Sequence, residues 1–130
     1  MKMRNGVERY ERNHKKSSKA LELAHYKCEC DSKHETFHIE NGHMYVEAHH
    51  LIPWNKYSKF DVSIDVISNI VSLCSVCDDC IHHGTKKDKC EMIKILYKKR
   101  RRRLKKAGLD VSLDQLLKYY GIKDSTKDKM

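Results

Sequence analysis

The sequence lacks any apolar run long enough to span a membrane, so we do not expect a channel, a transporter or another membrane-spanning protein. Its N-terminus is charged and has no apolar segment of the kind that directs secretion, so we expect a cytoplasmic protein. It also lacks an internal repeat and a linker long enough to separate domains. At 130 residues, the chain is therefore expected to form one domain with a small core.

Hydrophobic residues are few and charged residues are many. Hydrophobic residues make up 39% of the chain and charged residues 35%. The hydrophobic core is therefore modest, and the fold is expected to need a further cross-link such as a bound metal ion. The formal net charge of +9 favours an anionic partner. Nucleic acid fits that charge better than a membrane surface does, because no membrane-length segment accompanies it.

The chain has six cysteines. In a cytoplasmic protein, cysteines serve as metal ligands or free thiols more often than as disulfides. An even number in a short chain also fits a disulfide framework, and this alternative is weakened by the lack of a secretion signal. The cysteines are therefore expected to be metal ligands or free thiols.

The stretch from residue 45 to 84 combines two strand patterns with a helix pattern. A β-branched and aromatic run leads to His49 and His50 and is stopped by Pro53. Residues 70–73 form a second β-branched run directly after Asn69, and helical spacing follows. Asp78 and His82 are four residues apart and share a helix face. A strand, a loop, a strand and a helix would bring these side chains together, and the set suggests phosphodiester hydrolysis.

The same stretch resembles a known family. The run VEAHHLIPW, followed by D-x-x-x-N-I-V-S-L-C-x-x-C and I-H-H-G, is similar to the HNH or ββα-metal endonuclease motif. The resemblance is greatest to the restriction-type branch that carries EAHHLIP, and it covers roughly residues 20–84. One position departs: Asp78 stands where family members usually have the first helix histidine.

The resemblance implies a role for each residue of the motif. His49 would ligate a divalent ion, and His50 would be the general base. Histidine suits the second role because its unperturbed pKa is about 6.5, so it can accept a proton at neutral pH. Asn69 would hydrogen-bond the backbone across the loop and hold His50 in its working orientation. Asp78 and His82 would complete the ion's ligands. The departure at Asp78 favours magnesium or manganese over nickel or zinc, or marks a decayed site.

Cys74-x-x-Cys77 indicates a second metal site, because this spacing lets two thiolates coordinate one zinc ion. Cys28 begins the other half, and its partner is either Cys30 or His34. The resemblance favours His34, because related sequences have a histidine at that place. The alternative for all of these is that they are buried free thiols. Two further cysteines have no partner at ligand spacing and are expected to be bystanders: Cys80 and Cys90.

Residues 98–106 read KKRRRRLKK and are expected to be helical. Such a density of like charge is unfavourable unless an anion lies nearby, so phosphate backbone is the expected partner and a solvated helix face is the alternative. Arg100 shares a stripe with Leu96 and Leu104, so its stem is expected to pack while its charge reaches solvent. The expected nucleic-acid-binding residues are Lys98, Lys99, Arg100, Arg101, Arg102, Arg103, Lys105 and Lys106.

These patterns predict a small α+β fold. It comprises a ββα-metal core over residues 26–84, a zinc knuckle, one N-terminal helix starting at Ser17 or Ser18, and two C-terminal helices within residues 90–121. Residues 86–89 are expected to connect the core to the first of these. Gly108 and Gly121 are expected to end the two helices, and Ser112 to begin the second. The single domain covers residues 17–123, between a flexible basic N-terminus at 1–16 and a disordered tail at 124–130.

The expected function is a metal-dependent endonuclease that cuts DNA, as the cleavage module of a restriction or phage-type system. RNA is the less favoured substrate. A non-catalytic zinc-knuckle module that binds DNA is the rival hypothesis, and it gains if Asp78 has broken the site. Because no recognition module is visible, a homodimer or a separate recognition subunit is the expected further partner.

Overall fold

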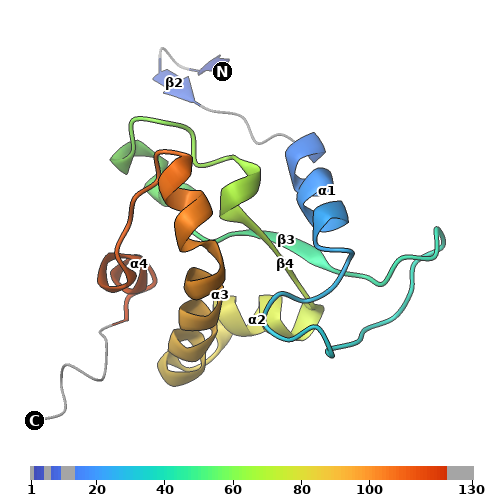
Figure 1. The fold of residues 1–130 in the computed structure, drawn as a ribbon. Helices are drawn as coiled ribbons and strands as arrows, with labels where there is room; N and C mark the ends of the chain where they lie inside the picture. The colour runs from blue at the N-terminus through green and yellow to red at the C-terminus, as the bar shows by residue number, and fades with distance from the viewer. Residues whose placement is uncertain (1, 5–6, 10–13, 123–130) are drawn as a thin grey trace, which may run out of the picture.

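The computed structural model describes residues 2–4, 7–9 and 14–122, which form a small α+β fold (Figure 1). A two-stranded antiparallel sheet lies near the centre, and helices pack around it. No helix in these described ranges has the length and apolar content required to cross a membrane. The α+β class expected from the sequence is confirmed at this level.

The central sheet consists of β3 (Glu47–His50) and β4 (Ile70–Leu73). All four residues of β4 are buried, which fits the apolar side chains of Ile70, Val71 and Leu73. The antiparallel register leaves His49 and His50 as the last residues of β3. The second strand matches the expected run. The first begins later than expected, because Tyr45 donates its N–H to the preceding loop rather than to β4.

Helix α2 (Ser75–His83) follows β4 directly. Cys74 caps it, with its Sγ accepting the Cys77 N–H at 3.4 Å. Asp78 lies in the first turn and His82 in the last, so the two project along one face, as the spacing predicts. The helix contacts both strands of the sheet and α3.

Helix α3 (Lys86–Lys106) begins earlier than the sequence pattern indicated. Residues 86–89 are its first turn and not a connector, because the Thr85 hydroxyl caps it by accepting the Asp88 N–H at 3.1 Å. One stripe of the helix is buried. The buried side chains are Cys90, Met92, Ile93, Leu96, Arg100 and Leu104.

Gly108 ends α3 as expected, with a φ of +84° that side chains rarely adopt. Helix α4 (Leu113–Tyr119) then begins at Ser112, whose hydroxyl accepts a backbone N–H of the first turn. Tyr97 of α3 donates its hydroxyl to the Val111 carbonyl at 2.7 Å. This bond ties the start of α4 to the long helix.

Helix α1 (His14–Leu23) begins before the expected start at Ser17. It contacts both strands of the central sheet, and Ala20 is its buried residue. The Lys16 ammonium donates to the Asp65 carbonyl oxygen at 2.8 Å. The N-terminal helix is therefore attached to the loop that joins the two strands.

The loop expected between the strands contains two short 3-10 helices, η1 (Trp54–Lys59) and η2 (Ile67–Asn69). Within the stretch expected to be a flexible N-terminus, β1 (Lys2–Arg4) pairs antiparallel with β2 (Val7–Arg9). The expected disordered tail at 124–130 lies outside the described residues.

An ion pair between Glu29 and Arg100 connects four parts of the fold. The guanidinium donates to both carboxylate oxygens at 2.8 Å, and the two side chains are only 14% and 4% exposed. Arg100 Nη1 also donates to the carbonyls of Ile67 and Ser68. The carboxylate in turn accepts the Ser72 N–H at 2.7 Å. The loop before the sheet, β4, η2 and α3 are thereby held together.

This arrangement corrects the expectation for Arg100. Its stem packs as predicted, but its charge does not reach solvent, because Glu29 neutralises it inside the fold. Its donors are committed to the carboxylate and two carbonyls. Arg100 is therefore a structural residue and is removed from the nucleic-acid-binding set.

Replacing Arg100 should destabilise the fold much more than replacing its neighbour. Arg100→Gln leaves the Glu29 charge buried without its partner, and breaking a buried pair in this way costs about 3–5 kcal/mol. Arg101→Gln removes the same charge from an exposed position and should change stability by less than about 0.5 kcal/mol. Urea unfolding of both variants measures the difference, and equal midpoints would contradict the structural role.

Candidate functional site

Four potential metal ligands converge beside the N-terminus of α2. One ligand atom each from Cys28, His34, Cys74 and Cys77 lies within 4.8 Å of the others. His34 Nδ1 is 3.7 Å from Cys74 Sγ and 3.5 Å from Cys77 Sγ. Ligands bound tetrahedrally to zinc at about 2.3 Å lie about 3.8 Å apart. The group therefore fits a tetrahedral ion, and it joins the loop after α1 to the start of α2.

Local structure prepares these ligands. Cys74 is the N-cap of α2 and Cys77 lies in its first turn, so the start of the helix fixes the two thiols relative to each other. His34 Nε2 faces the Asp31 carboxylate at 3.9 Å, while Nδ1 faces the thiols. A carboxylate behind a ligating imidazole is the arrangement that fixes ring orientation and raises ligand basicity.

Cys30 lies next to this group but is not one of the four. A hydrogen bond from the Cys30 thiol lowers the pKa of Cys28 to about 3 and raises that of Cys30. Burial is the main cause that raises the pKa of Cys77. His34, and not Cys30, belongs to the group of four whose ligand atoms lie within 4.8 Å of one another.

A second group of potential ligands combines β3 with α2. Ligand atoms of His49, Asp78 and His82 lie within 4.8 Å of one another. Asp78 Oδ1 is 3.6 Å from His82 Nε2, and the His49 and His82 rings meet edge to face with centroids 5.2 Å apart. Ligands held about 2.1 Å from an ion lie about 3–3.5 Å apart, so small adjustments would accommodate one. Oxygen and imidazole ligands together suit a divalent cation.

The environment of this group is graded from buried to open. His49 is buried, the Asp78 side chain is 15% exposed and the His82 side chain is 52% exposed. Burial raises the pKa of Asp78, His82 opposes that shift, and Asp79 adds to it. A cation between the ligands would favour the ionised carboxylate. The group is thus accessible to solvent from the His82 side.

His50, the next residue after His49, is held by a different partner. Its Nε2 lies 2.8 Å from Asp65 Oδ1, and the Asp65 side chain is only 2% exposed. A buried carboxylate accepts the Nε2–H, which leaves Nδ1 of His50 as the nitrogen that takes up a proton. The Trp54 ring packs edge to face on this imidazole at 5.4 Å.

Asn69 connects the two ends of the loop, as the sequence predicts. Its Oδ1 accepts the Ile52 N–H at 2.8 Å, and its Nδ2 donates to the carbonyls of Ile52 and Ile64. Because Ile64 directly precedes Asp65, the amide fixes the carboxylate that orients His50. The expected influence of Asn69 on His50 therefore acts through Asp65.

His49 also has a partner that the sequence did not indicate. Its Nε2 lies 2.9 Å from the Tyr120 hydroxyl oxygen, and that hydroxyl donates to the Leu51 carbonyl at 2.6 Å. Burial raises the pKa of Tyr120 far above its ordinary value, so the phenol is neutral. Tyr120 follows the last residue of α4, which brings the C-terminal helix to the site.

Sequence reasoning missed both supporting residues. Asp65 had a signal, because it is the first residue of the D-x-x-x-N pattern that ends at Asn69. Tyr120 had none, since it is 71 residues from His49 and fitted an ordinary apolar helix stripe. A contact at that separation depends on how α4 packs.

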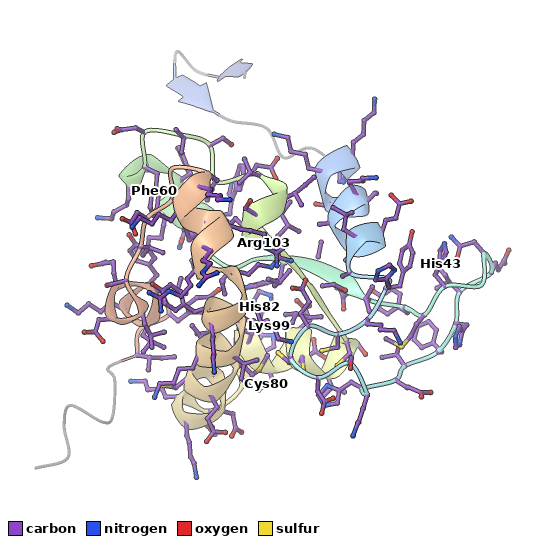
Figure 2. The ribbon with its side chains drawn as sticks, viewed as in Figure 1. His43, Phe60, Cys80, His82, Lys99 and Arg103 are labelled. Atoms are coloured by element: carbon purple, nitrogen blue, oxygen red, sulfur yellow. The ribbon has the colours of Figure 1, made fainter. Side chains whose placement is uncertain are left out.

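The basic stretch of α3 presents all its cations except Arg100 on the surface. Lys99 and Arg103 project from α3 (Figure 2), and with Lys27 they line a cavity of about 230 Å³ between α1 and α3. Seven of the expected nucleic-acid-binding residues are exposed, namely Lys98, Lys99, Arg101, Arg102, Arg103, Lys105 and Lys106.

No protein-family profile and no curated protein matches the chain. The resemblance carried by the motif residues therefore stays a prediction, and the chemistry of the site is argued from its own geometry.

The first group predicts which variants lose a bound metal ion. Cys77→Ser should lower metal content from about one ion per chain and destabilise the fold, because binding energy at such a site is folding energy. Cys80→Ser is the matched control, since Cys80 lies on the same helix outside both groups. Elemental analysis of protein purified without added metal gives the measurement.

The same experiment distinguishes the fourth ligand. His34→Ala should lose metal, whereas Cys30→Ser should retain most of it. A parent protein that is folded and free of metal would contradict the site altogether.

Proposed function

We propose that the chain is a metal-dependent endonuclease of the HNH, or ββα-metal, type that hydrolyses phosphodiester bonds in DNA. One observation carries the proposal. Consecutive histidines at the end of β3 have different partners: His49 belongs to a three-ligand group with Asp78 and His82, and His50 is bonded to Asp65. Such a pair suits hydrolysis of a phosphodiester, with an ion on one side and a proton acceptor on the other.

His50 is the general base in this proposal. The Asp65 carboxylate holds Nε2–H, so Nδ1 accepts the proton of the attacking water. The same carboxylate stabilises the imidazolium that forms, because opposite charges 2.8 Å apart in a buried setting attract strongly. Asn69 and the Lys16 ammonium, which donates to the Asp65 carbonyl, keep that carboxylate in place.

A divalent ion would be held by His49, Asp78 and His82. When bound, such an ion supplies charge neutralisation at the phosphate and stabilises the leaving oxygen. With a carboxylate among the three, the ligands are suited to magnesium or manganese as well as to softer ions. The exposure of His82 leaves that side of the group open to a phosphate.

The other group, Cys28, His34, Cys74 and Cys77, would hold a structural zinc ion. Three sulfur ligands and one imidazole with no open position are typical of a structural zinc site and not of a catalytic one. Because Cys74 and Cys77 begin the helix that carries Asp78 and His82, this ion would also fix the ligands of the catalytic ion.

DNA is the proposed substrate because exposed cations on α3 supply affinity for a phosphate backbone. Burying one guanidinium with Glu29 stabilises α3 while its other cations stay on the surface.

A second function is favoured by one residue. If Asp78 does not complete the ion's ligands, the chain would be a zinc-knuckle module that binds DNA without cutting it. The observation in its favour is that Asp78 and His82 can pair with each other, since Asp78 Oδ1 lies 3.6 Å from His82 Nε2. Cleavage assays separate the two functions.

His50→Ala should reduce cleavage by about 10²–10⁴-fold, because it removes the general base. Plasmid nicking with magnesium, manganese, nickel or zinc, and with EDTA as the metal-free control, gives the rate. Asp65→Asn keeps the shape but removes the charge, so it should lower the rate by a smaller factor. His83→Ala is the matched control, since His83 is exposed on α2 and lies outside the group formed by His49, Asp78 and His82.

In each variant, metal content, circular dichroism and DNA affinity should stay near those of the parent. If His50→Ala cleaves like the parent, the endonuclease mechanism is wrong and the binding module is the better account.

The exposed cations of α3 are tested by salt dependence. Arg101→Gln with Arg102→Gln should weaken DNA binding for all sequences alike and reduce the slope of log affinity against log salt by about 2, since each phosphate contact contributes about 0.9. Lys86→Gln with Lys87→Gln removes the same charge from the other end of α3. Equal slopes for the two double variants would show that net charge, and not this cluster, governs affinity.

A further inference from the structure

We propose that Tyr120 is a positioning residue that fixes the tautomer of His49, so that His49 offers Nδ1 to the divalent ion. The inference rests on the proposed ion at His49, Asp78 and His82, and it names how one of those ligands is prepared. It extends the site from β3 and α2 to the end of α4.

The hydrogen-bond partners of Tyr120 determine which nitrogen of His49 carries the proton. A neutral tyrosine hydroxyl has one proton to donate and can accept through its oxygen. The Tyr120 oxygen is 2.6 Å from the Leu51 carbonyl, which can only accept, so the phenolic proton is directed there. The same oxygen is 2.9 Å from His49 Nε2. With its own proton already given to Leu51, Tyr120 must accept, so Nε2 carries the hydrogen.

A neutral imidazole has one N–H. If Nε2 holds it, Nδ1 has the lone pair that a metal ion requires. The outer hydrogen bond thus determines which nitrogen becomes the ligand, a role that partners of metal-bound histidines commonly have. Asp65 acts in the same sense on His50, where it also takes the Nε2–H.

The fold holds Tyr120 firmly enough for this task. Gly121, with a φ of +74°, turns the chain directly after it, and the Ile122 N–H closes the end of α4 on the Leu117 carbonyl at 2.9 Å. Leu117 and Ile122 are buried. At the other end of α4, Tyr97 bonds the Val111 carbonyl. The hydroxyl position is therefore determined by the packing of both C-terminal helices.

The first test needs no variant. In protein containing its structural ion but no added divalent ion, nitrogen-15 NMR in mildly alkaline buffer should show His49 as the Nε2–H tautomer. Finding the hydrogen on Nδ1 would overturn the proposal.

The second test is manganese affinity measured by calorimetry. Tyr120→Phe keeps the ring but removes the acceptor, so His49 should populate both tautomers and bind manganese about 10–100-fold more weakly. Tyr119→Phe is the matched control, because it removes a phenolic hydroxyl from the neighbouring residue of α4, whose ring packs on Phe60 and not on His49. It should leave affinity and tautomer unchanged.

Equal affinities for the two variants, or no manganese binding by the parent, would overturn the role of Tyr120. The outcome is separable from that of the nuclease proposal. A parent that binds manganese through His49 Nδ1 but never cuts DNA would disprove the endonuclease and leave the positioning role intact.

Discussion

The rest of the structure depends on the buried ion pair between Glu29 and Arg100. Glu29 lies one residue after the first ligand of the thiol group, and its carboxylate also accepts the Ser72 N–H of β4. Arg100 bonds the carbonyls of η2, directly before Asn69. One interaction therefore fixes the knuckle, the sheet and the loop against α3. Because an isolated charge would be costly at this depth, these four parts are expected to assemble together.

The two adjacent histidines show how a strand end can give neighbouring residues different surroundings. Successive side chains of a strand point to opposite faces, so His49 and His50 face different surroundings although they are neighbours. His49 faces α2 and the end of α4, and His50 faces the loop that contains Asp65. Both bond a partner through Nε2. Neither partner comes from the strand itself, so the loop and the C-terminal helix determine what the strand end can do.

The sequence predicted the elements that depend on local patterns. The strand at 70–73, the cap at Ser112 and the turn at Gly108 follow from β-branching, a side-chain cap and a positive φ. The pair Cys74 and Cys77 and the pair Asp78 and His82 were predictable because their spacings fix relative positions. His34 was favoured only by the resemblance. The burial of Arg100 was not, because a basic run gives no sign of which member meets Glu29, 71 residues away. The contact of Tyr120 with His49 could not be predicted for the same reason, because it depends on tertiary packing.

Contacts at such long separations bear on how the site is maintained. His49 meets Tyr120, and Glu29 meets Arg100, each across 71 residues, so the geometry of both ligand groups depends on α3 and α4. The central strands and α2 alone would lack the acceptor for His49 Nε2–H and the cation for Glu29. The C-terminal helices therefore support the geometry of both groups. Helix α3 does so through its buried stripe, while its cations other than Arg100 are exposed to solvent on the rest of its surface.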